Sequence, residues 1–165
     1  MKFKLTWLLL LFISNNLIAE TYEDFMGRTV TAPDVMVTPM EDYILSSGFG
    51  IRKDPMGGAE YGLHRGLDMV AEDGAKIRSI ADGIVIDHWP PPDRRFKGHP
   101  IFGGYILILH ENGSISLYGH MSKTFVHIGK NIKMGETIGI IGNTGLSTGT
   151  HLHFELISDN YSFIN

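Results

Sequence analysis

Residues 105–120 read Tyr-Ile-Leu-Ile-Leu-His-Glu-Asn-Gly-Ser-Ile-Ser-Leu-Tyr-Gly-His, and they give the clearest indication of the fold class. Its first part is a continuous apolar run, Tyr105–Leu109, and apolar and polar residues alternate from Ile115 onward. Both patterns are typical of β-strands. Asn112 and Gly113 lie between them, and Asn-Gly is the strongest short-range signal for a β-hairpin turn. We therefore predict two antiparallel strands joined by a tight turn.

The same kind of pattern recurs on both sides of this hairpin. Alternation over residues 84–88 and short apolar runs at 138–141 and 152–157 predict further strands. Glycine accounts for 20 and proline for 7 of the 165 residues, and without a fixed period this composition favours many short strands and turns. The sequence thus predicts one all-β domain built on antiparallel sheet.

Charge and cysteine content exclude several classes of function. The formal net charge of −4 gives no electrostatic basis for binding nucleic acid or an anionic membrane. Cysteine is absent, which excludes disulfides, thiolate metal ligands and a cysteine nucleophile. Histidine is unusually frequent, with eight residues, so the search for a function begins with the histidines.

The first 19 residues have the features of an export signal. Lys2 and Lys4 precede an apolar stretch, Leu5–Ile13, which is well short of the ~20 residues needed to span a bilayer. Polar residues follow, and Ala19 is a suitable residue before a cleavage site. We expect export to the periplasm or the extracellular space, with no stable membrane insertion after cleavage. An uncleaved membrane anchor is the alternative interpretation of this segment, because Leu17 occupies a position where a small residue is preferred before a cleavage site.

Two further segments lack a strand pattern. Residues 20–42 show no apolar period, so we expect an irregular lead-in, followed by a domain over residues 43–165. Trp89–Pro100 contains three consecutive prolines and cannot be a central strand. It is either a solvated surface loop or the rim of a functional groove.

His64 and Asp68 form the first pair of residues that could carry chemistry. They are four positions apart, but Gly62 and Gly66 argue against a helix at this place. A turn or bend would have to bring the imidazole and the carboxylate together. Because such a pair arises easily by chance, it is weak when taken alone.

A stronger signal comes from the apolar run near the end of the chain. The two-residue period of a strand puts His151, His153 and Glu155 on one face. Polar groups on a whole face of a core strand are costly unless they have partners or a function. His120 ends another predicted strand, on the same face as Tyr118. We interpret the remaining histidines as ordinary surface or hydrogen-bonded residues: His88, His99, His110 and His127.

Together the selected side chains suit a metal site with a neighbouring base. Catalytic zinc typically takes three protein ligands from His and carboxylate groups and keeps a fourth position for water. Zinc lowers the pKa of that water to about 7, and a further imidazole can carry the proton to a leaving amine. The residues alone leave open which imidazoles bind the metal and which act as base.

The selected residues lie in four blocks of sequence: Ser47-Gly-Phe-Gly50-x-Arg52-x-Asp54-Pro55, His64-x-x-x-Asp68, Tyr118-Gly-His120 and Gly145-Leu-Ser-Thr-Gly149-Thr-His151-Leu-His153-Phe-Glu155. These blocks resemble the signature of the LytM/lysostaphin-type zinc endopeptidases, Peptidase family M23, in the order of that family. The resemblance extends from about Tyr43 to Ile157.

This resemblance implies a specific site and activity. One Zn²⁺ per chain would be held by His64, Asp68 and His153, and His120 and His151 would form the catalytic pair. The family hydrolyses peptide bonds in the stems or cross-links of bacterial peptidoglycan, which serves cell-wall remodelling or lysis. Its fold is an antiparallel β-sandwich, similar to the duplicated hybrid motif, with a groove over the metal.

Other interpretations are weaker. A non-catalytic relative that binds the wall or activates an amidase would not need an intact site. Whether an unidentified partner activates this protein is a separate question that the sequence leaves open. Ser147 lies in a Gly-x-Ser-x-Gly pattern, but a serine hydrolase needs a helix after it and a later histidine, and no histidine follows His153. A lipoyl-like carrier would give His64 and His151 no role. The end at Asn165, near where family members usually continue, leads us to expect a minimal or truncated domain.

Overall fold

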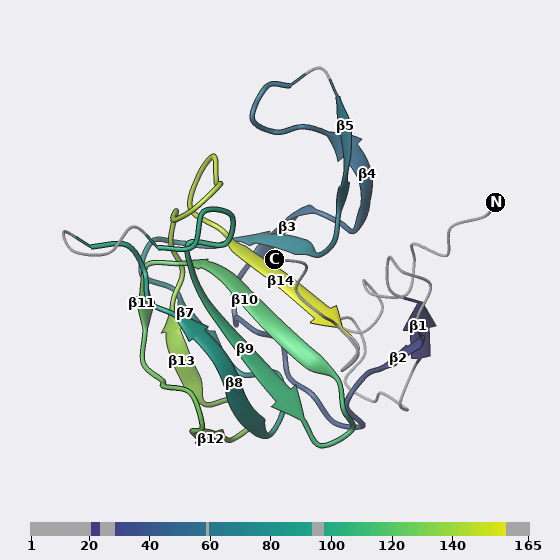
Figure 1. Cartoon of the computed structure of the whole chain (residues 1–165), viewed down its shortest axis with the longest axis vertical. Coiled ribbons are helices and arrows are strands. Elements are labelled where there is room, and N and C mark those ends of the chain that lie inside the picture. Colours follow the sequence, from purple (N-terminus) through teal and green to yellow (C-terminus); the bar gives the residue numbers. More distant parts are fainter. Residues whose placement is uncertain (1–20, 24–28, 59, 94–97, 158–165) are drawn as a thin grey trace.

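The computed structural model of the chain describes residues 21–23, 29–58, 60–93 and 98–157, so the expected export signal lies outside them. These residues form fourteen short β-strands and no helix (Figure 1). The prediction of an all-β fold is therefore confirmed. Since this part of the chain is free of helices, it holds no helix long and apolar enough to cross a membrane.

The main sheet has seven antiparallel strands, in the order β12-β8-β9-β10-β14-β6-β3. The hairpin predicted from residues 105–120 forms its centre, with Ile115 paired to Leu109. The strands of this sheet are β3 (Ile44–Ser47), β6 (Leu67–Val70), β8 (Gly83–Trp89), β9 (Gly104–His110), β10 (Ile115–Met121), β12 (Asn131–Ile132) and β14 (Leu152–Ile157).

A second, three-stranded sheet packs against the inner face of the main sheet. It comprises β7 (Lys76–Arg78), β11 (Lys123–Thr124) and β13 (Thr137–Ile140), in the order β11-β13-β7. Ile77 and Ile138 from this sheet share one buried cluster with Tyr118 and Phe154 from the main sheet. The Tyr118 hydroxyl also accepts a hydrogen bond from the Ile80 backbone N–H (3.0 Å). Shared apolar burial of this kind makes the two sheets a sandwich.

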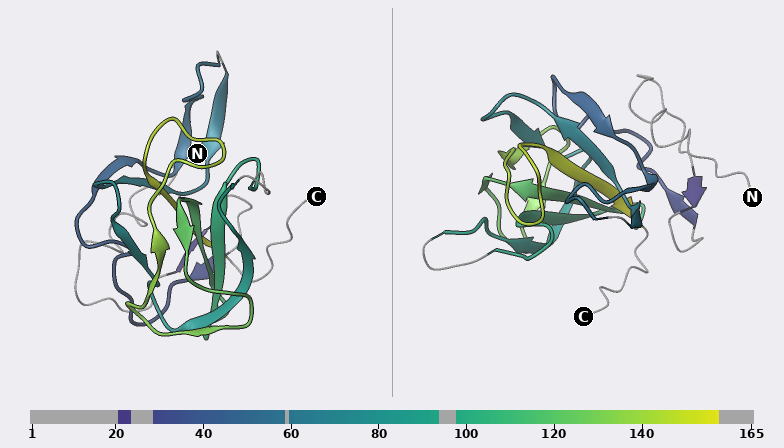
Figure 2. Two further views of the ribbon diagram at one scale, coloured as in Figure 1. Left: turned by 90° about the vertical axis from the view of Figure 1, so that its left-hand side faces the viewer. Right: turned by 90° about the horizontal axis from the view of Figure 1, so that it is seen from above.

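The hairpin of β4 (Gly50–Lys53) and β5 (Tyr61–His64) stands away from this sandwich. Figure 1 and the left view of Figure 2 both show it projecting from the body of the molecule. Its strands pair with each other from Gly50 opposite His64 to Lys53 opposite Tyr61. The base of the hairpin therefore contains a candidate ligand, His64, at the point where the hairpin joins the main sheet.

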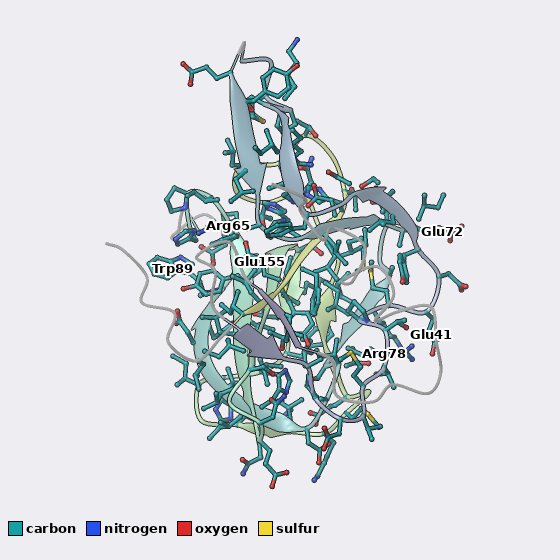
Figure 3. The ribbon with its side chains drawn as sticks, turned by 90° about the vertical axis from the view of Figure 1, so that its right-hand side faces the viewer. Glu41, Arg65, Glu72, Arg78, Trp89 and Glu155 are labelled. Carbon is teal, nitrogen blue, oxygen red and sulfur yellow. The ribbon has the colours of Figure 1, made fainter. Side chains whose placement is uncertain are left out.

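Part of the segment expected as an irregular lead-in, residues 32–41, is packed against the domain. The lead-in also contains the short antiparallel strands β1 (Thr21–Glu23) and β2 (Thr29–Thr31). Farther along, Ala32 and Met40 belong to the central buried cluster. Arg78 donates hydrogen bonds to the Thr38 carbonyl (2.8 Å) and to Glu41 (2.9 Å), a pair visible in Figure 3. Neither Ala32 nor Met40 follows a local apolar period, so the sequence pattern did not predict that they pack in the core.

One row of paired residues across the main sheet determines where the site lies. Gly119 on β10 is paired with His153 on β14, and His153 is paired in turn with Asp68 on β6. Ser47 on β3 is opposite Asp68. Paired residues in an antiparallel sheet put their side chains on the same face. The row thus runs across four neighbouring strands, on the outer face of the sheet, away from the apolar cluster between the two sheets. A second buried apolar cluster, which includes Leu107 and Leu117, lies beside the row on this outer face.

Candidate metal centre

Three of the predicted site residues meet on this outer face. Asp68 Oδ1 lies 3.0 Å from His64 Nε2 and 2.9 Å from His153 Nδ1, and the two nitrogens are 3.1 Å apart. All three side chains are buried. His64 and His153 are 89 positions apart in sequence, so the strand pairing of the sheet is what brings them together. Their ligand atoms form one group that could hold a metal ion.

The outer hydrogen bonds of the two imidazoles determine which nitrogens face the centre. His64 Nδ1–H donates to the Gly48 carbonyl (2.7 Å), and His153 Nε2–H donates to Glu155 Oε1 (2.9 Å). Second partners of this kind orient metal-ligating histidines in many proteins. The inner nitrogens and Asp68 Oδ1 are then three acceptor atoms at close range, and they need a cation or a proton between them. Ligand atoms of a tetrahedral zinc site lie roughly 3.3 Å apart, so the side chains present fit such an ion.

The electrostatics of the centre follow from its two carboxylates. Burial alone would raise the pKa of Asp68, but hydrogen bonds from His153 and His64 outweigh burial and lower this pKa well below its usual range. Burial alone would lower the pKa of His153, but hydrogen bonds to Asp68 and Glu155 outweigh it and raise this pKa to about 9. The centre therefore holds an ionised carboxylate and strongly attracts positive charge.

His120 and His151 lie beside this group, with their ring centroids 4.6 Å apart. His120 Nδ1–H donates to the Thr144 carbonyl (2.7 Å), and His151 Nδ1–H donates to the Gly149 carbonyl (2.8 Å). Each Nε2 atom therefore has a free lone pair in the neutral ring, and His151 Nε2 is 3.6 Å from Asp68 Oδ1. Burial, together with the neighbouring His151, lowers the pKa of His120 to about 4. His120 is thus neutral at physiological pH and can accept a proton.

The backbone of His120 corrects one expectation from the sequence. Regular alternation puts His120 on the face of Tyr118, but Tyr118 lies in the core while His120 lines the outer groove. The pairing of β10 with β9 shifts register between Tyr118 and Met121, and His120 has φ 62°, the one positive φ outside glycine among the described residues. The His120 N–H donates to the Phe102 carbonyl (2.7 Å) in this geometry. A bulge with a left-handed residue re-aims a side chain, and here it reverses the face of His120.

These side chains form the floor of an open groove of about 480 Å³. One wall is the β4–β5 hairpin, whose groove lining includes Arg52 and Met56. The opposite wall contains the 146–150 loop, in which Leu146 is half exposed, and Ile101 with Phe102. The face predicted for His151, His153 and Glu155 is confirmed, since all three line this groove. An extended chain can enter a groove of this shape along its open side.

The proline-rich Trp89–Pro100 loop packs behind one end of the groove. Trp89 stacks on Tyr105 with a centroid separation of 6.2 Å, and His99 stacks on Phe102 at 5.4 Å. None of the described residues of this loop lines the groove itself. In this part of the loop the aromatic residues therefore support the Phe102 wall from behind.

Some residues around the centre have contacts that were not predicted from the sequence. Glu155, only 1% exposed, accepts from His153 and lies 3.8 Å from the Arg65 side chain; both residues are labelled in Figure 3. Arg52 donates to Asp68 Oδ2 (2.7 Å). The Thr144 hydroxyl donates to the Met121 carbonyl (2.9 Å) and accepts from the Gly104 N–H (2.9 Å). The available signals were the two-residue period from His153 to Glu155 and the position of Arg52 in a signature block.

The other histidines lie outside the groove lining. His110 is buried and hydrogen-bonded, and His88 Nε2 bonds to the Thr124 hydroxyl (2.7 Å). His99 Nδ1 accepts from the Phe102 N–H (3.1 Å), and His127 is exposed. Their interpretation as ordinary surface or hydrogen-bonded residues is confirmed by these contacts.

Comparison with known proteins agrees with this architecture. Residues 62–164 match Peptidase family M23. The chain belongs to this family. Among curated relatives, the M23 chain is 38% identical over 122 residues to the DD-carboxypeptidase/endopeptidase Mpg of Neisseria meningitidis serogroup B, covering 72% of this chain and 25% of Mpg. It is 34% identical over 137 residues to the peptidoglycan DD-endopeptidase ShyC of Vibrio cholerae, covering 82% of this chain and 29% of ShyC. The chain thus spans about a quarter of the length of these relatives.

Solved structures confirm the M23 fold. A zinc-containing peptidase from Vibrio cholerae superposes with a TM-score of 0.66 at 31% identity, over 85% of this chain and 43% of that chain. The catalytic domain of lysostaphin from Staphylococcus simulans superposes with a TM-score of 0.59 at 29% identity, over 73% of this chain and 84% of that chain. The predicted antiparallel sandwich of the M23 type is therefore confirmed.

Proposed function

We propose that this M23 protein is a zinc-dependent endopeptidase that hydrolyses peptide bonds in the stems or cross-links of peptidoglycan. The observation that carries the proposal is the group of three acceptor atoms on His64, Asp68 and His153, about 3 Å apart, with the imidazoles of His120 and His151 beside it. The substrate class is supported by relatives that are named peptidoglycan DD-endopeptidases. The open groove suits an extended peptide rather than a small enclosed ligand.

His64 Nε2, Asp68 Oδ1 and His153 Nδ1 would hold one zinc ion per chain. When bound, zinc supplies Lewis-acid chemistry, which polarises a carbonyl and makes water more acidic. The surrounding partners of the three ligand residues keep their ligand atoms turned inward. Because Glu155 accepts from the far side of His153, that ring cannot rotate without breaking a buried hydrogen bond.

His120 and His151 would perform the proton transfers. Their Nδ1–H groups are bound to carbonyls, so both rings present Nε2 to the groove. A neutral imidazole at this position takes a proton from the attacking water and returns it to the leaving amine. The other imidazole, once protonated, stabilises negative charge that develops on the carbonyl oxygen. The low pKa of His120 keeps it in the form that accepts a proton.

Export to the periplasm or the extracellular space completes the proposal, because peptidoglycan lies there. It is supported by the charged and apolar pattern of the first 19 residues. His and Asp ligands, unlike thiolates, are not oxidised in an oxidising compartment, and the chain contains no cysteine. Expression of the full chain followed by cell fractionation tests this part directly.

The experiment that tests the activity combines metal analysis with muropeptide mass spectrometry. Purified protein is expected to carry close to one zinc per chain and to release peptides cleaved within a stem or cross-link from at least one type of wall. His127→Ala, an exposed residue outside the groove, serves as the matched control and should retain both properties. Protein that binds the wall but cleaves nothing from any source would instead support a wall-binding or amidase-activating role.

A further inference from the structure

The segment Ser46–Arg52 lies ahead of the residues that match the M23 family, 62–164. Nevertheless it contacts both His64 and Asp68. Its contacts come from the Ser46 hydroxyl, the Gly48 carbonyl and the Arg52 guanidinium, which is itself hydrogen-bonded to the Ser47 hydroxyl. One stretch of seven residues thus touches two of the three candidate metal ligands.

An irregular pairing at the edge of the main sheet makes this possible. Leu45 on β3 is paired with Met69 on β6, but the next pair is Ser47 with Asp68. Ser46 is therefore an extra residue on β3, as in a β-bulge, and both serines lie opposite Asp68. The Ser46 hydroxyl donates to the Asp68 carbonyl (3.0 Å), which fixes the backbone of the ligand residue.

Arg52 holds the side chain of the same residue. Its Nη1 donates to Asp68 Oδ2 (2.7 Å) and to the Ser47 hydroxyl (2.7 Å). The Asp68 side chain is 8% exposed and that of Arg52 is 33% exposed, so this ion pair is partly shielded from water. Charge-assisted hydrogen bonds in such surroundings are strong. With Oδ2 engaged by Arg52, only Oδ1 is directed at His64 and His153.

The turn between β3 and β4 completes the arrangement. The Gly48 carbonyl accepts from His64 Nδ1–H (2.7 Å) and thereby presents Nε2 to the centre. Gly50 has φ 137°, a conformation that L side chains rarely adopt, and there the chain enters β4. Arg52, two residues later, can therefore reach back to Asp68.

We propose that Ser46–Arg52 is a positioning segment for the metal centre, and that Arg52 restricts Asp68 to binding the metal through one oxygen. This inference rests on the metal centre of the proposed function. A carboxylate that binds through both oxygens raises the coordination number, as in calcium sites, whereas zinc prefers four ligands in a tetrahedron. By occupying Oδ2, Arg52 favours the four-coordinate ion. Lysine keeps the positive charge, but its compact ammonium on a flexible stem holds Asp68 Oδ2 less rigidly than the planar guanidinium does.

The test measures metal binding rather than turnover. Zinc affinity by competition with a chromogenic chelator, the visible spectrum of the cobalt-substituted protein, and the melting temperature of the metal-free protein are compared for wild type, Arg52→Met and Arg52→Lys. We expect zinc affinity to fall roughly 10–100-fold in Arg52→Met, the range found when outer partners of metal ligands are removed. The intense cobalt bands of a tetrahedral site should weaken as the coordination number rises. Arg52→Lys should lie between the two.

Arg78→Met is the matched control, since it also removes an arginine–carboxylate pair but lies at the lead-in, away from the centre. It should leave zinc affinity and the cobalt spectrum unchanged even if the protein melts earlier. If Arg52→Met does not fold, Ser47→Ala and Arg52→Lys test the positioning role instead. We expect a severalfold loss of zinc affinity in each of these variants.

Unchanged zinc affinity and an unchanged cobalt spectrum in the Arg52 variants would overturn the inference about Arg52. The proposed function would still stand in that case, provided that the wild-type protein binds zinc and cleaves peptidoglycan. A wild-type protein that binds no zinc would overturn the metal centre and this inference together. The two failures are thus distinguishable from the wild-type measurement alone.

Discussion

A buried cluster of polar groups that contains histidine lies near each end of strand β10, and the two clusters differ in their partners. Near the first end, His110 is 3% exposed; its Nδ1 bonds to the Asp82 carbonyl (2.8 Å) and its Nε2 to the Ser116 hydroxyl (2.8 Å). Near the other end, His64 and His153 direct acceptor nitrogens at each other and at Asp68.

Burial of a histidine therefore does not identify a functional site, whereas the match of hydrogen-bond donors and acceptors does. Every ring nitrogen of His110 faces a group that complements it, so the residue is satisfied by the protein alone. The acceptors at the other end complement a cation instead.

Removing a ligand should separate the two clusters most clearly. Asp68→Ala takes away the carboxylate at the centre, so we expect loss of zinc and a fall in wall hydrolysis of more than about 10³-fold. His110→Ala should keep one zinc per chain while losing about 1–3 kcal/mol of stability, because buried polar partners are left unpaired. Metal analysis and chemical denaturation check both variants. Loss of zinc in His110→Ala would contradict the distinction.

Removing a proton-transfer group should leave the metal in place. In His151→Ala we expect kcat to fall roughly 10²–10⁴-fold, which is the usual contribution of general acid–base catalysis. The zinc content should stay near that of wild type, because His151 lies beside the group of ligand atoms. Steady-state kinetics on a defined muropeptide, paired with metal analysis, measures the separation. A variant that loses zinc as readily as Asp68→Ala would assign His151 to the metal instead.

Loosening the support of His120 should have a smaller effect. The Thr144 hydroxyl donates to the Met121 carbonyl and accepts from the Gly104 N–H. The Thr144 carbonyl accepts from His120 Nδ1–H. Thr144→Val removes the hydroxyl at nearly constant volume, so we expect kcat to fall about tenfold through misplacement of the imidazole, with KM and zinc content little changed. Thr144→Ser restores the hydroxyl and should recover most of the activity. Equal losses in the serine and valine variants would argue against the hydroxyl as the cause.

The smallest expected effect is the pH dependence of stability from His110. Burial lowers the pKa of His110 below its ordinary value, partly offset by the Asp82 carbonyl. The unfolded chain, with an ordinary pKa of about 6.5, therefore binds the proton more readily than the folded chain. The stability from neutral His110 is complete above pH 6.5 and is lost as the pH falls toward the folded-state pKa.

His110→Gln removes this titration, so between pH 6.5 and 5 its stability should fall less steeply than that of wild type, by up to about 1.4 kcal/mol per pH unit. Thermal or urea unfolding across this pH range measures the difference in slope. Parallel curves for the two proteins would show that His110 titrates alike in both states. His127→Ala, at an exposed position, serves as the control.

Much of the fold could be predicted because its signals are local. The apolar run over 105–109, the Asn112-Gly113 turn and the alternation after Ile115 each report on neighbouring residues, and they became β9, the turn and β10. The same period correctly put His153 and Glu155 on one face. By contrast, the lead-in could not be predicted to pack, since Met40 reaches the core through contacts with distant strands.

The strands, the single β domain and the residue types of the centre could be predicted from local signals, because a two-residue period and turn chemistry act over a few positions. How these residues face one another depends on contacts between strands that are distant in sequence. The bulge before Met121 reversed the face of His120, and the bulge beside Ser47 brought Arg52 to Asp68. A bulge adds one residue to one strand, so its effect is visible only when the partner strand is known.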